Sequence, residues 1–301
     1  MYIMKEIIKF IIPLSITKII SSFIQKRKRD KYLIKLKKNI LIYHQSLSTN
    51  KDVNMVIDYL KSNPIQVFPY QFTRKYTKES INVFLDKNNG LKYVLHDNKK
   101  LYFKRSMNEG SIKALYRGLQ VDQDLNSPHL YLTSNFNLNS KDVIADIGCA
   151  EGNFTLDNIE KIKKAYLFES DLEWIEALES TFKPWIDKVT IVNKYVTNSD
   201  SNKTVNINSF YHKNKDITFF KVDIEGEEQK FLNACEPILN SSLKFKIAIC
   251  TYHKHNDEND FTKQLTSYGF EVKASEGFMI FIYDNLIKEP YLRKGILRAS
   301  K

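Results

Sequence analysis

Residues 143–152, Val-Ile-Ala-Asp-Ile-Gly-Cys-Ala-Glu-Gly, are the most informative segment of this 301-residue chain. An apolar, β-branched run leads to Asp146, and two glycines, Gly148 and Gly152, follow four positions apart. Residues 153–156, Asn-Phe-Thr-Leu, have the pattern of a helix that is beginning. The segment therefore predicts a strand, a tight turn and a helix N-terminus. Gly148 would allow the backbone to turn, and Gly152 would allow the helix and a ligand to approach closely.

Asp146 stands where a dinucleotide-binding turn avoids a carboxylate, because the pyrophosphate of such a ligand is anionic. S-adenosylmethionine (SAM) instead carries a sulfonium and an ammonium group and has no phosphate. The turn therefore favours SAM over a nicotinamide dinucleotide. The absence of the third glycine of a G-x-G-x-x-G pattern favours the same choice. For this segment alone, the alternative is a glycine turn in an unrelated α/β domain.

Strands and helices alternate regularly after residue 142. This pattern predicts an α/β fold with a doubly wound, mostly parallel, seven-stranded Rossmann-like sheet. The first five expected strands are short apolar or β-branched runs, at 143–147, 165–168, 189–193, 217–222 and 245–250. Two further runs, 270–274 and 278–283, flank a Ser-Glu-Gly turn and predict a closing antiparallel hairpin.

Polar residues follow the expected strands, at the edge where open α/β sheets bind ligands. Glu169 comes about 20 residues after the glycine turn, a spacing that suits a carboxylate accepting both ribose hydroxyls. Asn193 ends the third strand and Asp223 follows the fourth. The predicted cofactor-binding residues are Asp146, Gly148, Cys149, Gly152, Glu169, Asn193 and Asp223.

Asp223 and Glu225 stand close together after the fourth strand, where two carboxylates repel each other unless something offsets their charge. A bound divalent cation such as Mg²⁺, the ammonium of SAM, or Lys254 would do so. With His253 added, the predicted metal ligands are Asp223, Glu225 and His253. The alternative is that one of the two acids caps the following helix, whose first turn is also acidic.

Residues 120–131 are polar and directly precede the α/β domain, so they are placed to fold over the ligand end of the sheet. A histidine near a reacting group can act as general base. We therefore expect the proton acceptor to be His253 or His129, and Asp223 after these two. The alternative reading of 120–131 is a loop with aspartate caps and a solvated histidine.

Four motifs within residues 142–283 together resemble the FkbM-type methyltransferases. They are Asp146-Ile147-Gly148-x-x-x-Gly152, Phe168-Glu169, Asn193 and Lys221-Val222-Asp223-Ile224-Glu225-Gly226-x-Glu228. The earlier segment Ser127-Pro128-His129-x-Tyr131 is similar to a feature of a bacterial subgroup. The chain departs from the family at Ser170, where proline is usual. It also departs at Cys250–His253, where a glutamate often ends the fifth strand.

The resemblance implies a class I, SAM-dependent O-methyltransferase that modifies a sugar hydroxyl in a surface glycan or related glycoconjugate. Such an enzyme must align the attacking oxygen, the methyl carbon and the departing sulfur, and must remove the hydroxyl proton. Two other readings stay open: an NAD-dependent oxidoreductase or epimerase on a similar sheet, and a non-catalytic, membrane-apposed protein that keeps the SAM-binding fold.

The first 40 residues carry most of the excess positive charge. They hold eleven Lys and Arg against two acidic residues, whereas residues 142–301 hold twenty-one against twenty-five. Residues 1–31 join an isoleucine-rich stretch to a polybasic cluster, which predicts an amphipathic, basic segment lying on an anionic membrane surface. The alternative is a helix packed on the body of the protein, with a solvated charge run behind it.

We expect three parts in the chain: the basic segment 1–31, a helical region with a β-hairpin at 32–134 that caps the substrate, and a SAM-binding domain at 135–301. Because the basic excess lies mainly at the N-terminus, no nucleic-acid partner is expected. The three cysteines form no C-x-x-C pair, which argues against a disulfide framework or a structural zinc site. We therefore predict a cytoplasmic protein, peripheral on the inner face of the membrane if residues 1–31 bind it.

Overall fold

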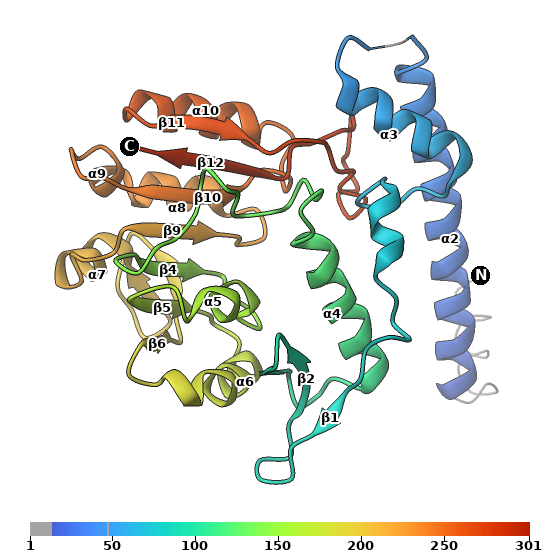
Figure 1. Ribbon diagram of the computed structural model, residues 1–301. Helices are drawn as coiled ribbons and strands as arrows, with labels where there is room; N and C mark the ends of the chain where they lie inside the picture. Colours follow the sequence, from blue (N-terminus) through green and yellow to red (C-terminus); the bar gives the residue numbers. More distant parts are fainter. Residues whose placement is uncertain (1–13, 47) are drawn as a thin grey trace, which may run out of the picture.

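The computed structural model describes residues 14–46 and 48–301, and a seven-stranded sheet lies at its centre (Figure 1). Its strands are β4 (Val143–Ile147), β5 (Lys164–Phe168), β6 (Val189–Val192), β9 (Phe219–Val222), β10 (Lys246–Cys250), β11 (Glu271–Ala274) and β12 (Ile296–Ser300). Their order across the sheet is β11-β12-β10-β9-β4-β5-β6. β12 is antiparallel to both of its neighbours, while the other adjacent pairs are parallel. The predicted fold class, an α/β fold with a mostly parallel seven-stranded sheet, is confirmed.

Helices cover both faces of the sheet, because alternate residues of each strand point to opposite sides. Ile144 and Phe219 face the core that contains α5 and α6, whereas Ala145 and Phe220 face the core beneath α7 to α10. All five residues of β4 are buried, as expected of a parallel strand covered on both faces. These helices are α5 (Asn153–Asn158), α6 (Leu172–Phe182), α7 (Ile207–Lys213), α8 (Glu228–Ala234), α9 (Glu236–Leu239) and α10 (Asp257–Ser267).

The N-terminal part of the chain is mainly helical and contains the predicted hairpin. Its helices are α2 (Leu14–Tyr43), α3 (Lys51–Ser62), the short 3₁₀ turn η1 (Gln71–Lys75) and α4 (Glu109–Asp122). The hairpin strands β2 (Lys92–His96) and β3 (Lys99–Tyr102) pair antiparallel, and β1 (Phe84–Leu85) adds a third strand. α4 stands between the sheet and α2 (Figure 1). Two elements absent from the sequence prediction, β7 (Tyr195–Thr197) and β8 (Thr204–Asn206), pair in parallel with each other.

The end of the chain differs from the prediction. Residues 278–283 are not the second strand of a closing hairpin; the strand that pairs with β11 is Ile296–Ser300. The physical reason is a third apolar core, in which Met279 and Ile280 pack with α2 and α3 instead of the sheet. The apolar run 278–283 therefore packs against helices, and its sequence pattern alone could not distinguish it from a strand.

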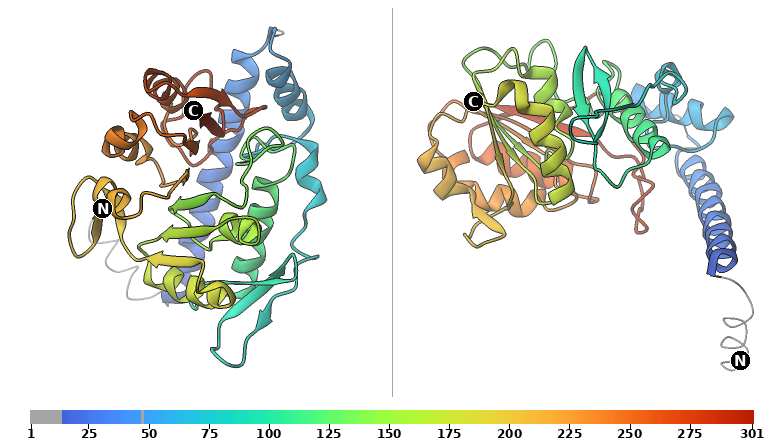
Figure 2. Two further views of the ribbon diagram at one scale, coloured as in Figure 1. Left: turned by 60° about the vertical axis from the view of Figure 1, so that its left-hand side comes forward. Right: turned by 90° about the horizontal axis from the view of Figure 1, so that it is seen from below.

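Helix α2 continues through the expected boundary at residues 31 and 32, so no break in secondary structure separates the first two predicted parts. Leu36 and Ile40 are buried in the third core, whereas Phe23 and Ile24 are exposed. The first described turns of α2 project away from the rest of the chain (Figure 2). Within residues 14–46 and 48–301, no helix combines the length and apolar character needed to cross a bilayer. Residues 1–13 lie outside the described chain, and membrane contact through 1–31 stays a prediction.

Candidate functional site

The glycine turn after β4 is tied to the two neighbouring strands. The backbone amides of Gly148 and Cys149 both donate to the carbonyl of Phe168, at 3.0 and 3.2 Å. Gly148 has a φ of +71°, and a Cβ at this position would overlap the carbonyl oxygen of Asp223. The turn thus lies directly against the end of β9, and only glycine fits there.

Asp146 is fully buried and its charge is neutralised inside the protein. Lys221 Nζ lies 3.1 Å from Asp146 Oδ1, and Thr155 Oγ1 donates to Oδ2 at 2.8 Å. Lys221 also donates to the carbonyl of Gly148 at 2.8 Å. Burial alone would lower the pKa of Lys221, but the carboxylates of Asp146 and then Asp223 raise it. In this geometry Asp146 anchors the turn, and its predicted contact with a cationic cofactor stays a prediction.

Gly152 and Cys149 also have structural roles, and their predicted contacts with cofactor stay predictions. A Cβ on Gly152 would lie 2.7 Å from Leu178 and 2.8 Å from Phe182, so this glycine lets α5 pack on α6. Cys149 is 3% exposed, and burial raises the pKa of its thiol well above the usual value. Its amide is bonded to Phe168, and its carbonyl accepts from Gly152 at 2.8 Å.

Glu169, at the end of β5, lies beside the turn as predicted. Its Oε2 accepts from the amide of Ala150 at 3.1 Å, and its Oε1 accepts from Ser170 and Asp171 at 2.7 and 2.8 Å. Asn193 Nδ2 donates to the backbone carbonyl of Glu169 at 3.0 Å. A carboxylate has about four lone-pair sites, so Glu169 keeps capacity for a further donor. The structure therefore brings Glu169, Asn193 and the glycine turn to one edge of the sheet.

Asp223 lies where this edge meets the segment that precedes the sheet domain. Its Oδ2 accepts from the hydroxyl of Tyr131 at 2.9 Å, and its Oδ1 accepts from Tyr252 at 3.3 Å. His129 Nε2 lies 3.8 Å from Oδ2. Burial tends to raise the pKa of Asp223, but Lys221 and then the nearby histidines outweigh it and lower the pKa. Asp223 is therefore an anion that joins strand β9 to the segment 120–131.

His253 lies among acidic groups on the other side of Asp223. Its Nε2 is 3.8 Å from Asp223 Oδ1 and 3.8 Å from Glu225 Oε2, and its Nδ1 is 2.9 Å from Glu228 Oε1. The predicted metal ligands are thus neighbours, and Glu228 is an additional member that the sequence reasoning missed. The signal for it was present, since Glu228 belongs to the same acidic run. Neither Asp223 nor Glu225 caps α8, and Lys254 donates to the carbonyl of Gly226.

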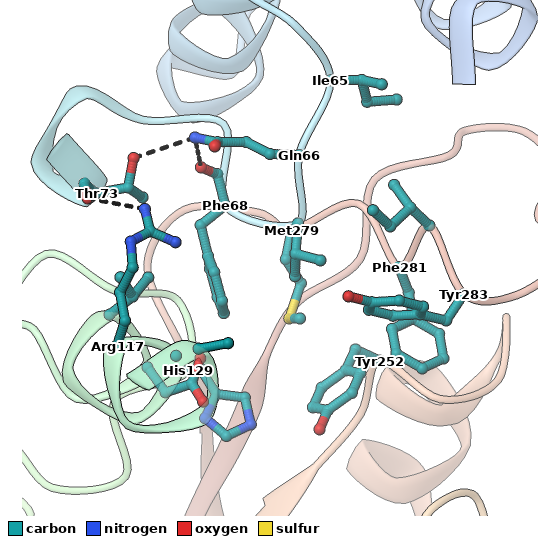
Figure 3. A pocket seen from close by; sticks show the side chains of 16 residues that line it. Ile65, Gln66, Phe68, Thr73, Arg117, His129, Tyr252, Met279, Phe281 and Tyr283 are labelled. Carbon is teal, nitrogen blue, oxygen red and sulfur yellow. Dashed lines mark hydrogen bonds between the residues drawn. The ribbon is translucent and has the colours of Figure 1, made fainter. Parts of the chain in front are cut away.

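A cavity of about 440 Å³ lies beside this part of the site, and Figure 3 shows the side chains that line it. His129 and Tyr252, which both contact Asp223, form part of its wall. Arg117, from α4, is held by the carbonyls of Tyr76 at 2.8 Å and Thr73 at 3.3 Å. The other aromatic side chains of the wall are Phe68, Phe281 and Tyr283. Segments far apart in the chain, 65–73, 114–129 and 279–283, therefore meet at one chamber beside the sheet edge.

Asp122, the last residue of α4, lines this cavity and was not among the predicted site residues. Burial raises its pKa to about 8, and the charges of Asp223 and Glu151 add to the effect. Burial lowers the pKa of His129 to about 4. Burial also disfavours a charged His253, but Glu228, followed by Asp223, outweighs it and raises the pKa of His253.

These shifts add a candidate for the proton acceptor. A general base works best when its pKa lies near the operating pH. Burial lowers the pKa of His129 to about 4, whereas the acidic neighbours of His253 raise its pKa. Asp122 combines a position on the cavity wall with a pKa of about 8. Asp122 therefore joins His253, His129 and Asp223 as a candidate.

No family model matches the chain, and no curated protein sequence matches it. Solved structures do match. One is the methyltransferase FkbM from Methylobacillus flagellatus KT, with 14% identity and a TM-score of 0.42 over 64% of this chain and 53% of the other. The chain therefore spans about half the length of that protein.

Two further matches have similar scores. A putative methyltransferase from Streptococcus mutans, in complex with SAH, shares 17% identity at a TM-score of 0.36, over 55% of this chain and 91% of the other. Precorrin-6y C5,15-methyltransferase from Geobacter metallireducens GS-15 shares 13% identity at a TM-score of 0.37, over 56% and 85%. No functional assignment follows from similarity at this level.

Proposed function

We propose that this chain is a SAM-dependent O-methyltransferase of the FkbM type that methylates a sugar hydroxyl in a surface glycan or related glycoconjugate. One observation carries the proposal: Asp223 lies between the glycine-turn edge of the sheet and the cavity. On one side its backbone abuts the glycine turn beside Glu169. On the other side its carboxylate contacts His129 and Tyr252, which line a cavity of about 440 Å³. A cofactor edge and an acceptor chamber that meet at one residue are what a group-transfer enzyme requires.

The proposed cofactor contacts come from the edge of the sheet. Glu169 would accept from a ribose hydroxyl through its remaining lone-pair site, which is the role of the acidic residue after the second strand of related sheets. Asn193 would hold Glu169 in place, because it already bonds the carbonyl of that residue. The ammonium of SAM would approach the Asp223 side of the edge. Asp146 would act at a distance, by keeping the turn in shape through Lys221.

The proposed transfer is a single displacement. The acceptor oxygen attacks the methyl carbon of SAM, the carbon–sulfur bond breaks, and its electron pair stays on sulfur. The hydroxyl proton passes to the carboxylate of Asp122, so the products are the methyl ether and neutral S-adenosylhomocysteine. The protein would contribute alignment of the three reacting atoms and a base with a suitable pKa.

The cavity wall suits a sugar ring. Phe68, Phe281 and Tyr283 offer flat apolar faces for the carbon-bound hydrogens of a sugar. Arg117 and Asp122 provide a donor and an acceptor for its hydroxyls. The aromatic faces and the few polar groups occur together, as is usual in small-molecule sites.

Calorimetric titration with SAM, S-adenosylhomocysteine and NAD tests the cofactor, and transfer of a labelled methyl group to a panel of sugar glycosides tests the reaction. We expect SAM and its product to bind, NAD to bind no more tightly than a buffer control, and label to appear as a methyl ether. Binding of NAD without SAM would favour the oxidoreductase reading. SAM binding with no transfer to any hydroxyl acceptor would favour the non-catalytic reading.

A further inference from the structure

The imidazole of His253 is held by one carboxylate and directed at two others. His253 is 8% exposed, and its Nδ1 lies 2.9 Å from Glu228 Oε1. Its Nε2 lies 3.8 Å from Asp223 Oδ1 and 3.8 Å from Glu225 Oε2. Within the described part of the chain, neither nitrogen of this ring forms a hydrogen bond of good geometry, so the contact of Nδ1 with Glu228 is an ion-pair contact. A buried ring nitrogen without a partner is costly, so the gap between Nε2 and the two carboxylates calls for an occupant.

Glu228 fixes the orientation of that ring. It is fully buried, and its Oε1 accepts from the backbone amides of Ile224 at 2.9 Å and Gly226 at 3.3 Å. A carboxylate that holds one imidazole nitrogen while the other nitrogen faces a cation is the usual arrangement around metal-binding histidines. Glu228 therefore has the position of a residue that orients a ligand.

The nearby lysines leave the negative charge of this cluster uncompensated. Lys221 lies 3.1 Å from Asp146 and bonds the turn, and Lys254 donates to the carbonyl of Gly226. Neither lysine forms a salt bridge with Glu225 among the described residues. Three carboxylates surrounding one imidazole therefore retain a net negative charge even when the ring is protonated, which favours a cation.

We propose that His253 Nε2, Asp223 and Glu225 bind one divalent transition-metal ion, with Glu228 as the residue that positions His253. One imidazole nitrogen and two carboxylates suit Mn²⁺ or Zn²⁺, whereas Mg²⁺ is bound through oxygen. Metal–ligand bonds of about 2.0–2.2 Å require the side chains of Asp223 and Glu225 to move closer to Nε2 than their present 3.8 Å. Glu225 has the freedom to do so, because its side chain is 91% exposed.

The site shares Asp223 with the proposed cofactor edge, but a metal ion bound there goes beyond the proposed transfer reaction. Its ligands lie on the β9 and β10 ends of the edge, whereas Glu169 and Asn193 lie on the β5 and β6 ends. Metal binding can therefore be measured on the full-length protein without SAM and without an acceptor.

The test uses the loss of the free Mn²⁺ paramagnetic resonance signal when MnCl₂ is added to the full-length, chelator-treated protein. We expect one Mn²⁺ to bind per chain. Glu225→Gln should weaken the Kd by about tenfold or more, as loss of a contact in or around a metal site does. Glu227→Gln is the matched control. Glu227 lies two residues after Glu225, and its exposed side chain pairs with Lys230. The substitution removes the same charge and should leave the Kd for Mn²⁺ unchanged.

Glu228→Gln should weaken the Kd by about 10–100-fold, because the residue orients the ligating ring. Zn²⁺ should displace Mn²⁺ at lower concentration than Mg²⁺ does; the reverse order would remove His253 from the ligand set. No Mn²⁺ binding, or equal weakening by Glu225→Gln and Glu227→Gln, would overturn the proposal. A parallel titration with SAM keeps the two proposals separate, because loss of SAM binding with Mn²⁺ binding intact contradicts only the proposed function.

Discussion

Asp146 in the glycine turn is fully buried and Asp122 on the cavity wall is half-buried, yet only Asp146 has charged and hydrogen-bonding partners among the described residues. Asp146 has an ion pair with Lys221 and a hydrogen bond from Thr155. Asp122 forms no hydrogen bond or salt bridge with the described residues, and its pKa rises to about 8. The paired carboxylate holds backbone in place, whereas the unpaired one is available to exchange a proton.

The same contrast separates the two halves of the sheet edge. The amides of the turn are bonded to Phe168 and Glu169, and Gly152 serves helix packing. At the ends of β9 and β10, by comparison, His253 Nε2 has no hydrogen-bond partner among the described residues. The motif that identifies the fold is therefore mostly structural, and the chemistry is expected where polar groups are left without partners.

The largest effect should come from removing the unpaired carboxylate. Asp122→Asn should lower kcat for methyl transfer by about 10²–10⁴-fold, the usual contribution of a general base. The Kd of SAM should stay the same. Labelled-methyl transfer and calorimetry measure the two quantities.

Asp124→Asn provides the control two residues later. Asp124 accepts from Tyr76 at 2.7 Å and from Lys75 at 3.2 Å, so its loss should reduce stability and spare kcat. If Asp122→Asn kept full turnover, or if both variants lost turnover equally, the distinction between paired and unpaired carboxylates would fail.

Breaking the pair in the turn should give the next largest effect. Lys221→Met leaves Asp146 buried without its partner, which typically reduces the free energy of unfolding by about 3–5 kcal/mol. Urea denaturation measures the change. The double variant Lys221→Met/Asp146→Leu should recover most of the loss, because no charge is then left buried. A single variant as stable as the parent would show that Asp146 does not depend on Lys221.

Gly148→Ala should reduce the free energy of unfolding by about 3 kcal/mol, which combines a left-handed backbone penalty with overpacking against Asp223. Gly269→Ala is the matched control. Gly269 also has a positive φ, +83°, but nothing lies within 4 Å of an added Cβ. Gly269→Ala should therefore reduce the free energy of unfolding by only about 1–2 kcal/mol, which is the backbone penalty alone. Equal losses in the two variants would contradict the close approach of the turn to β9.

A smaller, pH-dependent effect is expected at Asp86, another paired carboxylate. It accepts from Tyr102 at 2.5 Å and from Lys100 at 2.9 Å, and these two contacts hold its pKa well below the usual value. A lowered folded-state pKa gives stability that is present above the unfolded pKa of about 3.9 and is lost as pH falls.

Asp86→Asn should therefore be less stable than the parent at pH 7, and the difference should narrow below about pH 4. Urea denaturation at several pH values measures this. Asp58→Asn, at an exposed pair with Lys61, should change stability little at any pH. If the stability difference between the parent and Asp86→Asn grew as the pH fell, the pKa of Asp86 would not be lowered by folding.

Much of the fold could be predicted because local patterns of apolar and polar residues mark its strands and turns. The buried strands β4, β5, β9 and β10 are continuous apolar runs, and the hairpin β2–β3 surrounds a polar turn. The last strand was missed, since Ile296–Ser300 is short and half polar, whereas 278–283 is the more apolar run. Only the position of α2 and α3, far away in sequence, decides that Met279 and Ile280 face helices.

The candidate site shows the same limit. The rule that open α/β sheets bind ligands beyond the carboxyl ends of their strands correctly placed Glu169, Asn193 and Asp223 at one edge. It could not show that Asp146 meets Lys221, because that pairing depends on the register between β4 and β9. Nor could it reveal the burial that raises the pKa of Asp122, since the cavity is assembled from three distant segments.

The central claim is that the sheet edge binds SAM with Glu169 at the ribose. Calorimetric titration of SAM into the parent, Glu169→Gln and Glu173→Gln tests it most directly. Glu173 is the next glutamate along the chain and bonds Ser106, away from the turn. We predict that Glu169→Gln weakens the Kd by at least about tenfold, the value of one charged hydrogen bond, and that Glu173→Gln leaves it unchanged. No binding of SAM to the parent, or one Kd for all three proteins, would contradict the claim.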